Sequence, residues 1–525
     1  MKHLAVIAAL LLTAVSPVAA TPVVEWQSRF GGVDQDWANS VVPISGGGYL
    51  AAGTYMIQPG NPIYGGSEEF LLARTDAAGN PLWQKRFDLG LMSWGANAVE
   101  AGDGGFVMLG TVHVQWNYFN SHTALIKTDG DGNLLWTKTF TANRPGSIDN
   151  TEAGYVQRTL DGGFILLVSY IEYVGADNTV MLIKTDADGN EVWRARPGVP
   201  MAYGAMVRQT ADGGYAVCGS IGKGATEDVY NAYDAYLLKT TGDGSAEWSA
   251  SYGTNVYDGC GALRQTADGG FVLFGNTMNF DVENTTDYLL VRTNPTGTRL
   301  WQTVWGTTGD DWSGGVAEID GGGFLVSGSR RSANTTDELQ VQIEVTQFSA
   351  GGRRLSGVLL GEPSWSGLSY AEAASIEKTD DGGFIVGGMM VDDNWDPFMA
   401  KIAPLSIGPL VEVTIDIKPG FKTSSINLGA QGTTPVAILG TASFDATRVD
   451  PASVTLAGAP VAISSQGKLI ASVTDVNRDG RADLVVHVVT AKMAISFGDA
   501  AATLTGQTYD GTLIEGSDRV TVLIK

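Results

Sequence analysis

The stretch DGGFILLVSYIEYVGADNTVMLIKTDADGNEVWRA, residues 161–195, carries the pattern that decides the fold. A DGG turn leads into one apolar run, a second apolar run ends at KTDADGN, and a third run follows with Trp193. Glycine accepts the positive φ of tight turns at little cost, and Asp-Gly-Asn favours a hairpin. Short runs of apolar and β-branched residues between such turns predict consecutive antiparallel strands.

The same pattern recurs along the chain. An aromatic residue follows each first turn, at Tyr49, Phe106, Phe164, Tyr215, Phe271, Phe324 and Phe384. A tryptophan follows the second turn, at Trp83, Trp136, Trp193, Trp248 and Trp301, whereas the copy TQFSAGGRRLS has Leu355 where we expect the tryptophan. The first copy resolves into four runs, residues 38–44, 49–55, 70–75 and 82–87. Four strands in about 55 residues is one propeller blade, so the sequence predicts an all-β fold with a seven-bladed β-propeller in residues 21–403. We interpret the tryptophans as packing between blades.

The phase of the repeat predicts how the ring closes. The seventh copy stops after its third run, residues 398–402, and the chain begins with an isolated run, VEWQSRF (residues 24–30), that contains Trp26. Residues 24–30 would complete blade seven and leave no open sheet edge. We expect a linker at 404–410, which contains two prolines, and a β-sandwich-like domain from 411 to 525.

Composition and charge restrict the function and location of the chain. The net charge of -23 argues against nucleic acid as a partner, because a phosphate backbone binds Lys and Arg. Residues 1–20 have the basic start, short apolar run and small residues of a signal peptide. No other segment is apolar enough to enter a membrane. We therefore expect a monomer that is secreted, extracellular or periplasmic. Cys218 and Cys260 could be a disulfide or two buried thiols.

Two parts of the sequence resemble known families. The KTDADGNEVW phrases are distantly similar to the repeats of quinoprotein-type propellers, and the full DGGF…KTDxxGxxxW pattern resembles secreted bacterial and archaeal tandem-repeat propellers. The quinoprotein cofactor is not implied, because the chain has no adjacent cysteine pair. The phrases IDIKPG (415–420), TTPVAILG (433–440) and DVNRDGRADL (475–484) resemble a C-terminal β module of extracellular bacterial proteins. This second resemblance implies an extracellular location but no activity.

The segment DVNRDGRAD, residues 475–483, has the layout of a calcium loop. Oxygen-bearing side chains stand at positions 1, 3, 5 and 9, Gly480 allows a sharp turn, and position 7 offers its carbonyl. The expected ligands are Asp475, Asn477, Asp479, Arg481 and Asp483. Position 12 is Val486 rather than the bidentate Glu of an EF-hand. We expect a structural Ca²⁺ ion, and the alternative is a metal-free hydrogen-bonded turn.

Variable loops point to one face of the propeller as the binding surface. The loops between second and third strands are long and differ between copies, and binding residues concentrate in such loops. The expected ligand-binding residues are Trp116, Tyr118, Tyr230, Tyr233 and Trp395. We interpret the tryptophans and tyrosine that precede the first strands, Trp37, Trp94, Tyr203 and Trp312, as part of the architecture.

Three functions remain open from the sequence. The first is a secreted or cell-surface interaction protein that binds a carbohydrate or an extracellular protein. The second is an enzyme that acts on polysaccharide through paired acids, for which Asp34, Asp36, Asp310 and Asp311 are candidates. The third is a structural surface or matrix component. His113 and His122 lack the further ligands of a zinc site, and no catalytic residue is assigned.

Overall fold

A computed structural model describes most of the chain. The described residues are 21–31, 35–56, 68–114, 120–141, 151–170, 179–198, 202–222, 233–254, 256–279, 285–320, 322–331, 341–361, 370–391, 395–405, 410–421, 423–427, 429–430, 432–464, 466–493, 495, 498–510 and 512–523. The predicted signal peptide lies outside them. The chain divides into two compact units, residues 21–406 with 494–501 and residues 407–493 with 502–525. No helix in the described ranges has the length and apolar character needed to cross a bilayer.

The first unit consists of four-stranded antiparallel sheets. Two of them, β2–β5 and β6–β9, join into one eight-stranded sheet through a single parallel pairing of Glu68 with Met92. The strands of this larger sheet are β2 (Gln35–Pro43), β3 (Tyr49–Met56), β4 (Glu68–Thr75), β5 (Pro81–Phe87), β6 (Met92–Glu100), β7 (Phe106–His113), β8 (Ser121–Thr128) and β9 (Leu134–Phe140).

Each of the remaining sheets of this unit has four strands. They are β10 (Thr151–Arg158), β11 (Phe164–Tyr170), β12 (Thr179–Thr185) and β13 (Glu191–Ala195); β14 (Ala202–Gln209), β15 (Tyr215–Gly222), β16 (Tyr233–Thr240) and β17 (Ala246–Tyr252); β18 (Tyr257–Gln265), β19 (Phe271–Asn279), β20 (Thr285–Thr293) and β21 (Arg299–Trp305); β22 (Asp311–Glu318), β23 (Phe324–Arg331), β24 (Val341–Phe348) and β25 (Arg354–Leu360); and β26 (Tyr370–Lys378), β27 (Phe384–Val391), β28 (Trp395–Ile402) and β1 (Val24–Arg29).

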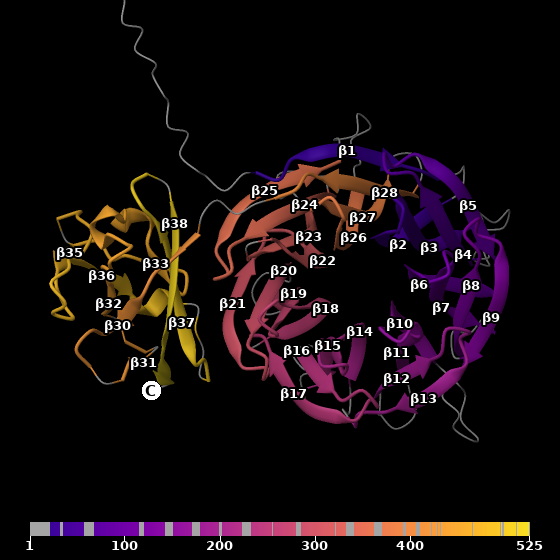
Figure 1. Ribbon diagram of the computed structural model, residues 1–525, viewed down its shortest axis with the longest axis horizontal. Helices are drawn as coiled ribbons and strands as arrows, with labels where there is room; N and C mark the ends of the chain where they lie inside the picture. The colour runs from indigo at the N-terminus through magenta and orange to yellow at the C-terminus, as the bar shows by residue number, and fades with distance from the viewer. Residues whose placement is uncertain are drawn as a thin grey trace, which may run out of the picture. The chain divides into compact units, whose positions relative to one another are not determined.

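The sheets are arranged as a β-propeller, which confirms the expected fold at that level. Figure 1 shows the first strand of every sheet at the inside of a ring and the last strand at the outside. The last sheet takes its outer strand from the other end of the chain, because β1 pairs antiparallel with β28. In Figure 1 the indigo β1 lies beside the orange β28. The backbone N–H groups of Phe30 and Ala403 extend this pairing by donating to Pro397 and Val23.

Each innermost strand has a β-bulge at the same register position. The pairing shifts by one residue after Ala38, Gly95, Ala153, Gly204, Cys260, Ser313 and Ala373, which all face equivalent residues of the next strand. A bulge bends a strand and increases its twist. The bulges therefore explain why the innermost strands begin before the runs that the hydrophobic pattern predicts.

Ion pairs explain why the DGG and KTD phrases recur together. A buried cation on the third strand of a sheet reaches the exposed aspartate of the first turn in the same sheet. The pairs are Lys127–Asp103 at 2.8 Å, Lys184–Asp161 at 2.9 Å, Lys239–Asp212 at 2.9 Å, Arg292–Asp268 at 2.6 Å and Lys401–Asp381 at 3.0 Å. The two turns of a sheet are thus fixed to each other.

The tryptophan of one sheet packs on the second-turn glycine of the following sheet. A β-carbon at Gly132 would lie 2.8 Å from the Trp83 ring, and Gly189, Gly244, Gly297 and Gly352 meet Trp136, Trp193, Trp248 and Trp301 in the same way. Trp26 makes this contact with Gly79 across the closure, and it also packs against Tyr49 at 5.6 Å between ring centroids. These contacts agree with the interpretation of the tryptophans as packing between blades.

The structure explains why the sheet β22–β25 has no tryptophan on its last strand. It also shows that the expected position of that tryptophan, Leu355, was wrong. The strand register places Ser356 opposite Gln347, as Trp193 lies opposite Lys184, so Ser356 and not Leu355 occupies the tryptophan position. The following sheet passes from β28 to β1 without a connecting turn, because these strands come from opposite ends of the chain. It therefore offers no turn glycine on which a tryptophan could pack.

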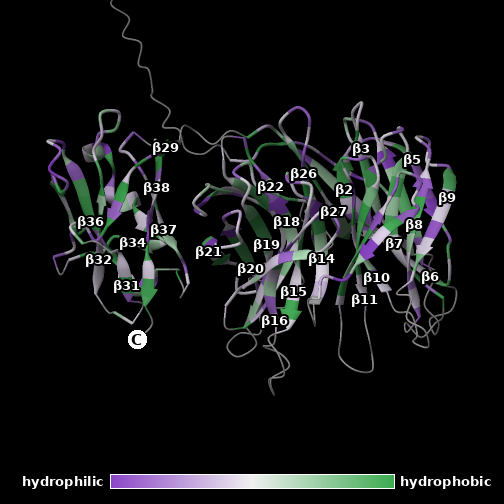
Figure 2. Ribbon diagram, turned by 60° about the horizontal axis from the view of Figure 1, so that its bottom comes forward, coloured by the Kyte–Doolittle hydropathy of each residue, from purple (hydrophilic) through white to green (hydrophobic). Residues whose placement is uncertain are grey.

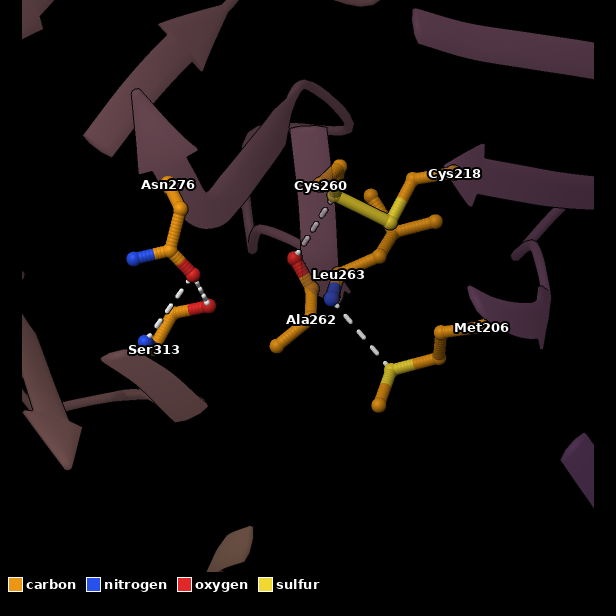
Figure 3. The surroundings of a disulfide bond; sticks show 7 residues. All are labelled: Met206, Cys218, Cys260, Ala262, Leu263, Asn276 and Ser313. Atoms are coloured by element: carbon orange, nitrogen blue, oxygen red, sulfur yellow. Dashed lines mark hydrogen bonds between the residues drawn. A yellow bond between two sulfur atoms is a disulfide. The ribbon is translucent and has the colours of Figure 1, made fainter. Parts of the chain in front are cut away.

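A disulfide joins two neighbouring sheets of the propeller. Cys218 of β15 and Cys260 of β18 are bonded, with a Cα–Cα distance of 5.8 Å, and both are buried (Figure 3). They belong to a hydrophobic cluster that includes Leu237, Tyr252 and Leu289. The sequence left open whether these cysteines pair, and the structure pairs them.

Removing the disulfide should destabilise the propeller. The bond closes a loop with a sequence separation of 42 residues, and a bond of this kind contributes about 3 kcal/mol. We expect Cys218→Ala/Cys260→Ala to lower the free energy of unfolding by about that amount in a denaturant titration. Reductant should lower the wild type to the same level once the buried sulfurs become accessible, and should leave the double variant unchanged. An equal midpoint for both proteins would contradict the role of the bond.

The second unit is also built from strands. One sheet contains β29 (Leu410–Glu412), β38 (Leu513–Arg519), β37 (Ala501–Gln507), β33 (Thr455–Leu456) and β34 (Ala459–Pro460); another contains β30 (Ile415–Ile417), β32 (Thr433–Ile438), β36 (Asp483–Val489) and β35 (Ala471–Thr474); and β31 (Ser425–Asn427) pairs with β39 (Thr521–Leu523). Its helical segments in the described ranges are the 3-10 turns Ala446–Arg448, Pro451–Ser453 and Thr490–Lys492. Figure 2 shows hydrophobic residues concentrated along the strands of both units.

Candidate functional site

The two ends of the propeller strands differ in what they expose. At one end lie the first and second turns, which repeat the same backbone hydrogen bonds from sheet to sheet, as in Thr159 with Gly163 and Asp186 with Asn190. The carboxylates of this end are already engaged: the Thr379 hydroxyl and the Lys401 ammonium hold the pKa of Asp381 at about 2. We call this end the turn face, and it is occupied by contacts that build the ring.

The opposite end, which we call the loop face, carries tryptophan, tyrosine, glutamate or glycine at one equivalent position of each sheet. These residues precede the bulge on the innermost strands and pair with the second strands, and they are Trp37, Trp94, Glu152, Tyr203, Gly259, Trp312 and Glu372. The side chain of Trp312 is 44% exposed. Four of the seven residues are aromatic, as their interpretation as part of the architecture expects, whereas Glu152, Gly259 and Glu372 depart from this pattern.

Three tyrosines form a continuous aromatic cluster on the loop face. Tyr233, at the start of β16, contacts Tyr203 of β14 at 6.1 Å and Tyr257 of β18 at 5.4 Å between ring centroids. All three rings are partly exposed. Glu152 holds the position of Tyr203 in the neighbouring sheet, and burial, followed by Tyr233 and Glu152, raises the pKa of Tyr203. We call Tyr203, Tyr233, Tyr257 and Glu152 the tyrosine cluster.

Two further tryptophans make aromatic contacts on this face, one between neighbouring sheets and one within a sheet. Trp395, at the start of β28, meets Trp37 of β2 edge to face at 6.4 Å. Trp94 of β6 donates its indole N–H to Glu68 of β4 and lies 4.6 Å from the ring of His113. Burial raises the pKa of Glu68 and lowers that of His113, so a neutral imidazole is favoured there. His113 is buried and has no zinc-like set of partners among the described residues.

Two of the acids considered as catalytic candidates, Asp310 and Asp311, make contacts with loop backbone. Asp36, Asp258 and Asp311 occupy one equivalent position, two residues before the bulge, and all are fully buried. Asp258 accepts the backbone N–H of Thr254 at 2.6 Å, and Asp311 accepts that of Thr307 at 2.5 Å. Asp310 accepts the backbone N–H of Thr286 and pairs with Arg331. Asp34 lies outside the described residues. These contacts favour a structural role over acid/base chemistry.

Asp311 should make the stability of the propeller depend on pH. Burial, with a contribution from the nearby Asp287, raises the pKa of Asp311 to about 6 from the ordinary 3.8. Between these values the folded chain keeps a proton that the unfolded chain releases, so stability is lost as the pH rises from about 4 to 6. The Asp311→Asn variant should not show this loss of stability. Between pH 4 and 6 its change in the free energy of unfolding, measured with urea, should differ from that of the wild type by at most about 3 kcal/mol. Asp310→Asn is the control and should retain the wild-type dependence. Parallel pH profiles for wild type and Asp311→Asn would contradict the assignment.

Side chains from opposite sides of the ring meet near its centre. Glu377 of β26 pairs with Arg208 of β14 at 2.9 Å and with Arg264 of β18. Figure 1 shows β26 across the centre of the ring from β14. Arg208 also lies 4.8 Å from the centroid of the Tyr155 ring on β10. Burial alone would raise the pKa of Glu377, but Arg264 and Arg208 hold it at about 2. This central ion triad occupies the interior of the ring with charged groups that satisfy one another.

The structure describes two of the five ligand-binding residues that the sequence predicts, Tyr233 and Trp395. Tyr233 and Trp395 lie at equivalent positions, at the starts of the third strands of their sheets, and both contact other aromatics on the loop face. Trp116, Tyr118 and Tyr230 lie outside the described residues. Sequence reasoning missed Tyr257 and Glu152, because neither belongs to a long loop. An alignment of the copies on the bulge would have shown Glu152 in the same column as Trp37.

The predicted calcium loop is a compact turn between β35 and β36. Asp475 accepts the backbone N–H groups of Asp479 and Gly480, and Asp479 accepts that of Arg481. Asp483 is fully buried and accepts from Gly440 and Val476, both at 2.8 Å. In the described part of the chain no three acidic, His or Cys side chains form a metal centre by themselves. The loop could complete a calcium site only with the Asn477 amide and the Arg481 carbonyl, oxygens that suit this ion.

No protein-family model matches the sequence, and no curated protein matches it. The chain is similar in fold to the polysaccharide lyase Uly1, with 10% identity and a TM-score of 0.48 over 72% of this chain and 99% of the lyase. It is similar to PorZ, a surface component of the type-IX secretion system of Porphyromonas gingivalis, with 11% identity and a TM-score of 0.42 over 93% of this chain and 59% of PorZ. It is also similar to the β-propeller domain of the Trilobed protease from Pyrococcus furiosus, with 9% identity and a TM-score of 0.36 over 71% and 95%.

Proposed function

We propose that this chain is an extracellular binding protein whose loop face takes up a carbohydrate or protein ligand. The observation that carries the proposal is the contrast between the two faces. The turn face repeats one set of structural contacts, whereas the loop face changes its residues from sheet to sheet and leaves aromatic side chains such as Trp312 accessible. Partly exposed aromatic residues on a rigid scaffold are typical of binding surfaces.

The proposal includes a seven-bladed propeller followed by a β-sandwich. The single parallel pairing of Glu68 with Met92 is too short to unite two blades, so β2–β5 and β6–β9 count as separate blades. The five other four-stranded sheets then bring the number to seven. In the second unit, the larger sheets have buried residues such as Ile438, Val486 and Leu504, which supports packing of one sheet on the other.

An extracellular location is supported by the disulfide. Bonds such as Cys218–Cys260 persist in oxidising compartments and are rare in the cytosol. The expected signal peptide, residues 1–20, would direct the chain there. N-terminal sequencing of secreted protein should begin at Thr21, and a product that begins at Met1 would contradict the export proposal.

A binding screen tests the function. Immobilised glycans and extracellular proteins should retain the wild-type protein, and Trp312→Ala and Trp395→Ala should each weaken the retention. Tyr509→Ala is the matched control, because Tyr509 is an aromatic residue of the second unit that is 71% exposed. If no glycan or protein is retained by the wild type, the chain is a structural component instead. Release of shortened glycans would support the enzyme alternative, which the buried positions of Asp36 and Asp311 disfavour.

We also propose that the loop at residues 475–483 binds a structural calcium ion. The ion would offset the charge of three carboxylates and stabilise the turn between β35 and β36. At roughly 100-fold excess over its dissociation constant, Ca²⁺ should stabilise the second unit by about 2.7 kcal/mol, measured as a shift in its thermal unfolding. Asp475→Ala should abolish this response. Asp445→Ala, which removes a cap from a 3-10 turn, should keep it. An unchanged melting profile on chelation would contradict the site.

A further inference from the structure

The arrangement of the rings in the tyrosine cluster indicates which kind of ligand could bind there. Its rings come from the first and third strands of one sheet and the first strand of the next, so they form a surface that spans two neighbouring sheets. Adjacent rings meet at tilts of 51° and 52° and with centroids 6.1 and 5.4 Å apart. Rings at this separation contact each other directly and form one continuous, tilted aromatic surface.

The polar groups of the cluster are hydroxyls and carboxyls. Glu152 of β10 and Tyr203 of β14 hold the same position before the bulge in neighbouring sheets, and the Tyr233 phenol and the Glu152 carboxyl both contribute to the raised pKa of Tyr203. Asp234 follows Tyr233 directly in the sequence, and the whole chain has a net charge of -23. A surface with this charge repels anionic polymers and lowers their local concentration. The apolar face of a pyranose ring can pack on tyrosine while its hydroxyls hydrogen-bond a carboxyl and a phenol.

The centre of the ring limits how a polymer could bind. The central ion triad joins β26 to β14 and β18, and its guanidinium and carboxylate groups fill the interior between those strands. A polysaccharide chain passing through the ring would have to break these ion pairs between mostly buried side chains. A polymer that binds here lies across the loop face and does not pass through the propeller.

We propose that the tyrosine cluster is a binding site for a neutral polysaccharide, with its pyranose rings on Tyr203, Tyr233 and Tyr257 and a sugar hydroxyl on Glu152. The inference rests on the proposed binding function and specifies its ligand class and location. The negative charge of the chain disfavours anionic polysaccharides.

Isothermal titration of the full chain tests the site with defined probes: cellohexaose, xylohexaose and mannohexaose as neutral chains, hexagalacturonate as an anionic chain, and the fully deacetylated chitosan hexamer as a cationic chain. At least one neutral hexamer should bind, and hexagalacturonate should not. Tyr233→Ala should weaken binding of that hexamer about tenfold, the loss expected for one stacked aromatic ring. Tyr233→Phe should retain most of the affinity, because it keeps the ring. Tyr509→Ala and the thermal unfolding of each variant control for general effects.

The outcomes separate the inference from the proposed function. Binding of a neutral hexamer that Tyr233→Ala does not weaken would overturn the location of the site while the binding function stands. Binding of hexagalacturonate or of the chitosan hexamer in place of the neutral chains would overturn the ligand class. If none of the probes binds and the wider screen still finds a protein ligand, the inference is wrong and the binding function remains. Failure of both experiments would overturn the two together.

Discussion

Deleting residues 21–31 should destabilise the propeller more than any single substitution. The deletion removes β1, which supplies the outer strand of its sheet by pairing with β28. It also removes Trp26 from its contacts with Gly79 and Tyr49 in the next sheet. Loss of one buried tryptophan typically costs about 3–5 kcal/mol, and the exposed edge of β28 adds unpaired backbone groups. We expect a loss of more than about 5 kcal/mol, together with aggregation, in thermal unfolding and light scattering.

A peptide provides the control for this deletion. A synthetic peptide of residues 21–31 should restore the melting temperature of the truncated protein, because the missing strand is held only by non-covalent contacts. The same peptide with Trp26→Ala should restore much less. In the full chain, Trp26→Ala alone should lower the stability by about 2–3 kcal/mol, because Trp26 is partly and not fully buried. An unchanged melting temperature after the deletion would show that β1 does not close the ring.

Replacing Glu377 should have the next largest effect. Glu377→Gln leaves Arg208 and Arg264 near the centre of the ring without their shared carboxylate. Breaking a buried ion pair in this way costs about 3–5 kcal/mol, because the remaining charges stay desolvated. We expect a loss of about 4 kcal/mol in the free energy of unfolding at neutral pH. Asp320→Asn is the matched control, since it breaks an exposed pair with the adjacent Lys378 and should cost less than about 1 kcal/mol.

The pH dependence of Glu377 offers a second measurement. Its pKa is held at about 2, below the ordinary 4.5, so the folded chain keeps the carboxylate charged where the unfolded chain takes up a proton. The stabilisation is complete above about pH 4.5 and is lost as the pH falls towards 2. The difference in stability between wild type and Glu377→Gln should therefore shrink on acidification. A constant difference between pH 5 and 2.5 would contradict the ion triad.

The sequence predicted the parts of the fold that depend on local chemistry. Glycine turns and alternating apolar runs placed the starts of β3 and β7 at Tyr49 and Phe106, as observed. The bulges were not predicted, because a bulge depends on the partner strand and leaves no mark on the hydrophobic pattern. The expected tryptophan position at Leu355 was wrong by one residue. It was assigned from the degenerate phrase TQFSAGGRRLS, and the pairing of Gln347 with Ser356 shows that Ser356 holds this position.

The sequence predicted less of the candidate site than of the fold. Tyr233 and Trp395 were found because they adjoin variable loops, but their partners lie on other strands. The central ion triad joins residues as far apart as 208 and 377, and no spacing rule links them. Asp311 looked like a surface acid because a net charge of -23 makes acids common. Its burial follows from the loop that it caps, which depends on the tertiary arrangement.

The contacts between tryptophans and turn glycines all run the same way around the ring, from one sheet to the next sheet in the chain. Each sheet supplies a tryptophan to the sheet that follows it, and the series ends at Ser356 because the last sheet has no glycine turn to receive one. A circular permutant could exploit this polarity. Joining Ile402 to Val24 through a DADGN linker would create the absent turn, and new termini between β24 and β25, in the turn that carries Gly352, would move the gap to the preceding sheet. In that permutant Ser356→Trp should become stabilising and Trp301 dispensable, so the position of the gap, and not the identity of the repeat, determines which copy can omit its tryptophan.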